Sequence, residues 1–182
     1  SPLMHPNVCK EVEYFVKNFI SKEDNLKILD IGSLQLPRSS NKDELQPSLK
    51  QTFDGDKWKY IGCDMVEGPN VDVVVKDTDS YPFDSCSFDV VVSNNCLEHD
   101  PKFWVTFNEM ERLLKSGGYL FLMVPQLFET HRYPVDCWRF QSEDAMQALA
   151  DWNKRVTLIE AYVSEWFPGA SANDCVGIFK KL

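Results

Sequence analysis

The sequence predicts an α/β fold, in which a doubly wound, mostly parallel seven-stranded sheet closes with an antiparallel last strand. Two observations carry this prediction. Short apolar runs rich in β-branched residues alternate with stretches of helical spacing along the 182 residues, a pattern typical of strands joined by crossover helices. The last two runs, 156–163 and 176–181, lie too close together for a crossover helix, so the final strand should be antiparallel to its neighbour.

The first elements are a helix, a strand and a long connection. Apolar residues at helical spacing predict an N-terminal helix within residues 1–22, starting near Pro6 because proline suits a first helical turn. The apolar run 26–31 predicts the first strand. A polar insertion, 34–58, follows, with a short helix expected over 43–51. Connections of this length are usually functional lids or mobile segments.

Capping and turn residues mark where the other helices and strands begin and end. Asp100-Pro101 suits a helix start, and Gly117-Gly118 suits the end of that helix. Ser142 can cap the next helix through its hydroxyl. The expected order is strands at 59–63, 71–75 and 88–93, a helix from 100, a strand at 119–124, a helix at 142–153, and the two closing strands. Residues 1–182 should therefore form a single domain.

Composition excludes several functional classes. The formal net charge of −9 and the lack of a dense Lys/Arg run argue against a nucleic-acid partner. No apolar stretch reaches the length of a membrane span, so no membrane partner is expected. The 6 cysteines are scattered without a Cys-x-x-Cys pair, which predicts neither a metal site nor a disulfide framework and favours a cytoplasmic setting. Composition leaves the oligomeric state open.

The most informative segment is the end of the first predicted strand, Asp30-Ile31-Gly32-Ser33. Open α/β sheets bind cofactors at such strand ends, and a glycine there lets backbone N–H groups come close to a ligand. Asp30 adds a fixed negative charge. Leu34 and Leu36, however, stand where a glycine-rich phosphate loop would continue. The segment therefore predicts a nucleotide-type site and restricts which nucleotide it can hold.

Two further carboxylates follow the second and third predicted strands, so that Asp30, Asp64 and Asp77 should meet at one edge of the sheet. A carboxylate after the second strand suits a ribose, because it can accept hydrogen bonds from both hydroxyls. Met65 could lie against a purine face, and Asp77 could accept from an exocyclic amine. Each aspartate could instead cap a turn.

With these motifs in place, the sequence resembles a class I S-adenosylmethionine-dependent methyltransferase of the small-molecule, seven-stranded, Rossmann-like type. The resemblance runs from about residue 27 to residue 125 and continues more loosely to the end. Its motifs are Ile28-Leu29-Asp30-Ile31-Gly32-Ser33, Tyr60-Ile61-Gly62-Cys63-Asp64-Met65, Asp77 with Tyr81-Pro82-Phe83-Asp84, Ser87-Phe88-Asp89, Leu97-Glu98-His99 and Leu113-Leu114-Lys115-Ser116-Gly117-Gly118. The ordered set is more specific than any one of them.

The resemblance implies S-adenosylmethionine as cofactor and gives the motif residues roles. Asp30 and Gly32 would face its methionine part, Asp64 with Met65 the ribose and base, Asp77 with Thr78 the adenine end, and Ser93-Asn94 the methionyl end. The first motif has fewer glycines than most members. S-adenosylmethionine has no phosphate and carries a sulfonium cation, so this loss counts against NAD(P) more than against S-adenosylmethionine.

The acceptor of the methyl group is expected beside residues 130–140, which follow a strand's carboxyl end and mix ionisable with aromatic groups. His131 is the candidate general base and Asp136 its orienting partner. The candidate substrate-binding residues are Arg132, Tyr133, Trp138 and Arg139. The alternatives are a loop histidine bound to backbone, an Asp136–Arg139 ion pair that pins the loop, and aromatic cover for the core. His99 is expected to orient its turn.

Three functions compete on this evidence. The first is methyl transfer from S-adenosylmethionine to a small-molecule acceptor, at oxygen. The second is an NAD(P) oxidoreductase, which would need a Gly-x-Gly-x-x-Gly turn and an acidic residue about 20 positions later; here Asp64 lies much farther along the chain than that. The third is a methyltransferase-like binding or scaffold protein without catalytic activity.

Overall fold

The computed structural model describes residues 6–38, 41–165 and 172–182. Within these ranges, strands alternate with helices and loops in the order that the sequence predicts. The elements are α1 (Pro6–Phe19), β1 (Leu26–Ile31), the 3₁₀ turn η1 (Leu49–Gln51), β2 (Trp58–Asp64), β3 (Val73–Val74), β4 (Phe88–Asn94), the 3₁₀ turn η2 (Leu97–His99), α2 (Phe103–Leu113), β5 (Leu114–Leu127), α3 (Asp144–Asn153), β6 (Val156–Glu165) and β7 (Asn173–Lys181).

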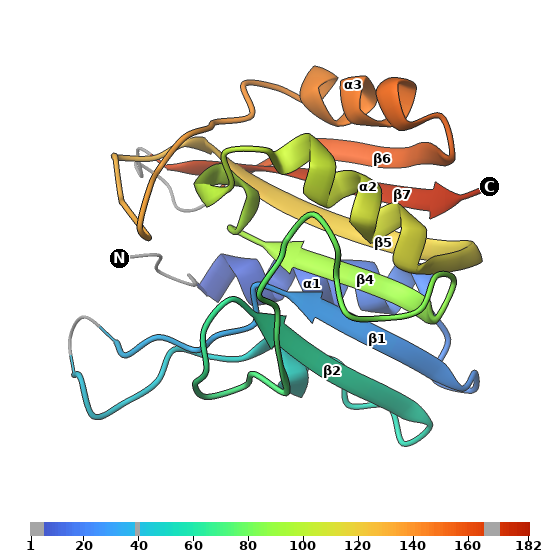
Figure 1. Ribbon diagram of the computed structural model, residues 1–182, viewed down its shortest axis with the longest axis horizontal. Coiled ribbons are helices and arrows are strands. Elements are labelled where there is room, and N and C mark those ends of the chain that lie inside the picture. Colours follow the sequence, from blue (N-terminus) through green and yellow to red (C-terminus); the bar gives the residue numbers. More distant parts are fainter. Residues whose placement is uncertain (1–5, 39–40, 166–171) are drawn as a thin grey trace.

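The strands form one seven-stranded sheet in the order β3-β2-β1-β4-β5-β7-β6. β1 pairs in parallel with β2 on one side and with β4 on the other, and β4 continues in parallel to β5. β7 pairs antiparallel with both β5 and β6, which confirms the predicted antiparallel last strand. In Figure 1 the arrowheads of β1 and β4 point to the left of the view, and that of β7 points to the right.

Helices cover both faces of the sheet. α1 lies behind the sheet in Figure 1, and α2 and α3 lie in front of it. Because side chains alternate along each strand, β1 serves both layers: Ile28 packs with Phe15 of α1, and Leu29 packs in the cluster that holds Phe107 of α2. Each layer thus buries a core of its own, and the sheet is doubly wound as predicted.

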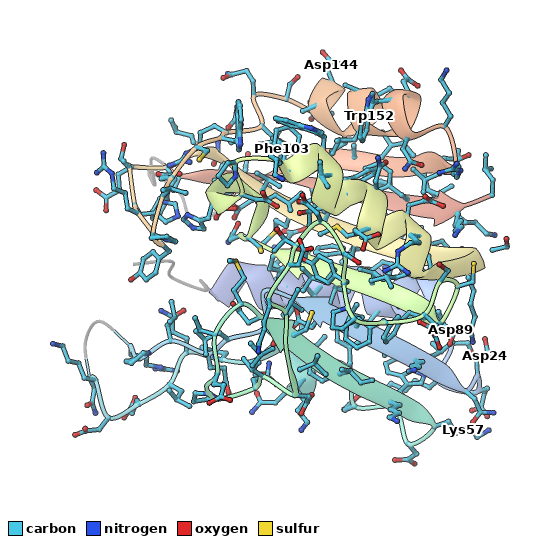
Figure 2. The ribbon with its side chains drawn as sticks, in the orientation of Figure 1. Asp24, Lys57, Asp89, Phe103, Asp144 and Trp152 are labelled. Atoms are coloured by element: carbon cyan, nitrogen blue, oxygen red, sulfur yellow. The ribbon has the colours of Figure 1, made fainter. Side chains whose placement is uncertain are left out.

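At the amino ends of the parallel strands, hydrogen bonds join β1 to its two neighbours. Asp24, Lys57 and Asp89, labelled at the lower right of Figure 2, lie at the amino ends of β1, β2 and β4. There the Asp89 Oδ2 accepts from the Lys27 amide at 2.8 Å, and the Lys57 carbonyl accepts from the Leu26 amide at 3.3 Å. The opposite, carboxyl ends stay open to form a site.

Two expectations about local structure are wrong. Residues 43–51 do not form a helix. Pro37 instead makes an antiparallel bridge with Leu45, and only the 3₁₀ turn η1 follows. Pro47 explains the difference, because a proline inside a helix removes a hydrogen bond and clashes with the preceding turn. The helix before Gly117-Gly118 also ends earlier than expected, since β5 already starts at Leu114, paired with Phe88.

None of the helices in the described ranges is both long enough and apolar enough to cross a membrane.

Candidate functional site

A cavity of about 900 Å³ opens at the carboxyl ends of β1, β2 and β4. It lies beside the point where the strand order reverses between β1 and β4, the place at which open α/β sheets bind ligands. Its volume falls in the range usual for cofactor and ligand pockets. Most of its wall is supplied by residues 30–36, 46–49, 63–66, 94–96, 99–101 and 132–135.

Asp30 and Gly32 both lie on the cavity wall. Asp30 is 3 % exposed, and its carboxylate accepts a hydrogen bond from the Tyr60 hydroxyl. Burial raises the pKa of Asp30 to about 7, against the lowering effect of the Tyr60 hydrogen bond. Gly32 has φ of 82°, and a Cβ there would lie 2.8 Å from the Cys96 Sγ. Only glycine therefore fits this turn without strain.

Asp64 stands beside them at the end of β2 and also lines the cavity. Its Oδ2 accepts from the Leu34 amide at 3.0 Å, and its Oδ1 accepts from the Met65 amide at 2.7 Å. Each oxygen keeps a further lone pair for a ligand. The Met65 side chain is 63 % exposed and lies on the cavity wall.

The remaining predicted cofactor residues divide into two groups. Thr78 and Asn94 line the cavity, whereas Asp77 and Ser93 do not. Asp77 is exposed, and its Oδ1 accepts from the Asp79 amide at 2.9 Å, as in a turn. Ser93 is fully buried within β4, directly before Asn94. Both carboxamide atoms of Asn94 are buried and lack a hydrogen-bond partner among the described residues.

The loop after β5 is fixed by an ion pair. Both guanidinium nitrogens of Arg139 contact Asp136, at 2.6 Å to Oδ1 and 2.7 Å to Oδ2. This bidentate pair lowers the pKa of Asp136 to about 2. The Asp136 Oδ2 also accepts from the His131 amide at 2.8 Å. Asp136 and Arg139 thus bond to the loop itself, and neither lines the cavity.

Of the other predicted substrate-binding residues, two reach the cavity. Arg132 and Tyr133 line it, together with Pro134 and Val135. Trp138 instead turns toward α2: its Nε1 donates to the Asp100 carbonyl at 2.9 Å, and its ring packs edge-on against Phe103. The acceptor end of the cavity is therefore formed by residues 132–135 alone within this loop.

His131, the expected general base, does not line the cavity. Its side chain is buried, with the residue 7 % exposed, and its Nδ1 lies 3.0 Å from the Glu129 carbonyl. The Glu98 carboxylate raises the pKa of His131 above its ordinary value. The ring packs edge-on against His99, with ring centroids 4.8 Å apart, and His99 does line the cavity. In this geometry His131 acts on the cavity only through its neighbours.

Sequence reasoning misses two residues of this region. Glu98 enters it only as part of a motif, yet it is fully buried beside both histidines. His99 is expected to orient its turn, yet its ring reaches the cavity. A short 3₁₀ turn has no periodicity from which to infer which side chains face inward. The mutual position of η2 and the loop depends on the Cys137 and Trp138 amides, which donate to the Glu98 carbonyl at 2.7 and 3.1 Å.

A scan against protein families and a search of solved structures give concordant results. Residues 49–122 match the family model described as a methyltransferase domain. That range includes Asp64 and the Leu97-Glu98-His99 triplet, but it starts after Asp30 and Gly32. No curated protein matches the chain.

The solved structures share the fold at low sequence identity. A Burkholderia thailandensis 1,6-didemethyltoxoflavin-N1-methyltransferase, with 1,6-didemethyltoxoflavin and S-adenosylhomocysteine bound, is 15 % identical with a TM-score of 0.67, over 95 % of this chain and 77 % of that one. A Methanosarcina mazei S-adenosylmethionine-dependent methyltransferase is 19 % identical with a TM-score of 0.62, over 92 % and 97 %. The [4+2]-cyclase SpnF is 12 % identical with a TM-score of 0.65, over 95 % and 81 %.

The lining of the cavity fits S-adenosylmethionine, the cofactor that the sequence resemblance implies. The carboxyl groups of Asp30 and Asp64 on its wall can face cationic and hydroxyl groups. Gly32 lets the backbone approach closely. Residues 49–122 thus match a methyltransferase domain, and the chain shares its fold with solved S-adenosylmethionine-dependent methyltransferases.

Proposed function

We propose that this protein transfers the methyl group of S-adenosylmethionine to an oxygen atom of a small-molecule acceptor. The observation that carries the proposal is the single continuous cavity, which joins the motif residues at the ends of β1 and β2 to the loop after β5. Bound there, the cofactor supplies a methyl carbon activated by a positive sulfonium. The protein then has to align the acceptor in line with that carbon and exclude water.

At the cofactor end, Asp64 would accept hydrogen bonds from the ribose hydroxyls, and Asp30 with Gly32 would border the methionyl part. The exposed Met65 side chain suits the flat face of the base. Thr78 lines the wall where Asp77 does not, so we assign the adenine contact to the Thr78 region of that loop. Ser93 contributes through its position in β4 rather than through a side chain on the wall.

At the acceptor end, Arg132 is the one Lys or Arg side chain on the cavity wall among residues 6–38, 41–165 and 172–182. A guanidinium favours an anionic acceptor, because it pairs with carboxylate or phosphate through two parallel bonds. Tyr133 lies next to it, 46 % exposed, and offers an aromatic surface. We therefore propose a small acceptor that carries an acidic group.

The buried position of His131 changes its proposed role. Methylation of a hydroxyl requires that the oxygen lose its proton, but His131 does not meet the cavity directly. We propose that His131 and Asp136 position the wall at His99 and residues 132–135. The His131 amide donates to Asp136, and Asp136 in turn holds Arg139, so these residues fix the loop that presents Arg132 and Tyr133.

A second candidate is a protein that keeps the fold but carries out no methyl transfer. The observation that favours it is the cofactor turn, where Leu34 and Leu36 line the cavity in place of glycines. A [4+2]-cyclase shares the fold, so the fold alone does not imply methyl transfer. Cofactor binding and turnover separate the two candidates, because a scaffold needs neither.

The cofactor assignment is tested by calorimetric titration with S-adenosylhomocysteine. Replacing Asp64 by alanine should weaken binding roughly 10- to 100-fold, since hydrogen bonds to a charged group contribute about 1.5–3 kcal/mol each. Asp77→Ala is the matched control, because this exposed aspartate lies off the wall. Failure of the unmodified protein to bind the ligand would refute the proposal. Equal losses in both variants would contradict the assignment of the two aspartates.

The acceptor is tested by incubating the protein with S-adenosylmethionine and a panel of small hydroxylated acids, and by measuring S-adenosylhomocysteine release. Arg132→Gln should raise KM for anionic acceptors while leaving S-adenosylhomocysteine affinity unchanged. Neutral acceptors that perform as well as their acidic counterparts would contradict the role of Arg132.

A further inference from the structure

We propose that Glu98, His99 and His131 form a binding site for one transition-metal ion, of the Zn²⁺ or Fe²⁺ class, beside the acceptor end of the cavity. One potential ligand atom from each of the three side chains lies within 4.8 Å of the other two. Two imidazoles and one carboxylate are a ligand set used by zinc enzymes and by non-haem iron sites.

The first observation is the state of the Glu98 carboxylate. Glu98 is fully buried, and neither of its carboxylate oxygens has a hydrogen-bond partner among the described residues. A buried carboxylate without compensation is one of the most unfavourable features that a folded protein can carry. The two nearest groups that could compensate it are the imidazoles of His99 and His131. Their Nε2 atoms lie 3.4 and 3.7 Å from its Oε1.

The second observation is the orientation of both histidines. The His99 Nδ1 lies 2.7 Å from the Val135 carbonyl, and the His131 Nδ1 lies 3.0 Å from the Glu129 carbonyl. A carbonyl can only accept, so each Nδ1 carries a proton, and the Nε2 of each ring faces Glu98. Metal-bound histidines commonly donate their other N–H to a backbone carbonyl in this way.

Taken together, two imidazole Nε2 atoms and a carboxylate oxygen face one another inside the protein. The spacing suits an ion, because ligands at zinc distances from a common centre lie about 3.3 Å apart in a tetrahedral site. The two Nε2–Oε1 separations are close to that value. The widest spacing among the three ligand atoms is 4.8 Å, so binding of one metal would draw the side chains together by roughly 1.5 Å.

The site borders the cavity through His99, which lines the wall together with Asp100 and residues 132–135. Three protein ligands leave a position open for an exogenous oxygen. A metal at that position lowers the pKa of a bound hydroxyl, which is what an oxygen acceptor needs and what the buried His131 does not supply directly. This role rests on the proposed methyl transfer, whereas the binding of the ion does not.

The test uses protein stripped with a chelator and titrated with Co²⁺, whose visible absorption reports its coordination, with Zn²⁺ as competitor. We expect one equivalent per chain, displaced by Zn²⁺. Glu98→Gln should weaken binding at least about tenfold. Glu129→Gln is the matched control, since it removes the same charge from an exposed residue of the adjoining loop. His5→Ala removes the third histidine of the chain and should leave binding unchanged.

A second measurement does not depend on the folding of a variant. In the ¹⁵N-labelled protein, the imidazole nitrogen spectrum should show Nδ1–H tautomers for His99 and His131, and Zn²⁺ should shift their Nε2 signals. The proposal would be overturned if both nitrogens of a histidine were protonated and the spectrum did not respond to Zn²⁺, because the three side chains would then form an ion-pair cluster only. Equal Co²⁺ affinity in Glu98→Gln would also overturn it.

S-adenosylhomocysteine titrations of the stripped and loaded protein separate this proposal from the function. Metal binding without S-adenosylhomocysteine binding keeps the metal site and refutes methyl transfer. S-adenosylhomocysteine binding without metal binding refutes the metal site and leaves the proposed methyl transfer standing.

Discussion

Ionisation of Asp30 should make the stability of this protein depend on pH in an unusual direction. The residue is 3 % exposed, and burial holds its pKa at about 7 in the folded chain, against 3.8 for the unfolded reference. The folded state therefore favours the protonated carboxyl. Well below pH 3.8 both states are protonated, so ionisation of Asp30 has no effect on stability there. As pH rises toward 7 only the unfolded state ionises, so stability falls, and the loss is complete above the folded pKa.

The magnitude follows from the two pKa values. A difference of about 3 units corresponds to about 4 kcal/mol in the free energy of unfolding, at 1.36 kcal/mol per unit. Between about pH 5 and pH 8, roughly 2.5 kcal/mol of this loss should develop. An asparagine side chain at this position cannot ionise but keeps an oxygen that can accept from Tyr60. Asp30→Asn should therefore be more stable than the unmodified chain at pH 8 and nearly equal to it at pH 4.

The assay is urea unfolding of both proteins at a series of pH values, followed by tryptophan fluorescence. The difference in unfolding free energy between the two proteins isolates Asp30, because all other titrating groups cancel. Asp24→Asn, at the exposed opposite end of β1 (Figure 2), is the control and should show a flat difference. A flat difference for Asp30→Asn as well would mean that the carboxylate is ionised throughout, and the reasoning from burial would be refuted.

Three further outcomes follow from the same geometry. Gly32→Ala should destabilise the protein by roughly 1–2 kcal/mol more than Gly117→Ala in urea unfolding, because both have φ near 80° but only the first places a Cβ against Cys96. Equal losses in the two variants would mean that backbone strain alone causes them and that the contact with Cys96 adds nothing. Tyr60→Phe should cost about 1–3 kcal/mol and move the pH-dependent loss to higher pH, since the hydroxyl lowers the neighbouring carboxyl pKa; an unmoved profile would contradict the hydrogen bond. Arg139→Lys should speed hydrogen exchange across the loop after β5, because lysine cannot form two parallel bonds; unchanged exchange would show that other contacts fix the loop.

The fold could be predicted from the sequence because its strands carry their own signal. β1 and β4 are apolar on both faces, as strands between two helical layers must be, so their limits could be placed closely. The antiparallel last strand followed from connection length alone. The prediction of a short helix over 43–51 was wrong because the polar composition of this segment fits a helix or a loop equally well. The bridge between Pro37 and Leu45 depends on tertiary contacts, which composition does not reveal.

The candidate site was predictable in part for a related reason. Residues at the ends of parallel strands must converge, so Asp30 and Asp64 could be placed on one wall from topology. Loop residues carry no such constraint. Neighbours in the chain, Arg132 and His131, point to different surroundings, one on the cavity wall and one in the interior. That division is set by the Asp136–Arg139 pair and by the contact with Glu98, neither of which has a periodic signature.

The two backbone hydrogen bonds to Asp64 have a consequence for the energetics of cofactor recognition. Its carboxylate is already oriented by the Leu34 and Met65 amides in the free protein, so a ribose would meet a preorganised acceptor. Immobilising a free side chain on binding costs about 0.5–1.5 kcal/mol, and the proposed contact of Asp64 with a ribose avoids that loss. The donor at position 34 is a main-chain N–H, which leucine provides as well as glycine does. A turn with few glycines is thus more rigid and still provides the backbone N–H that orients Asp64.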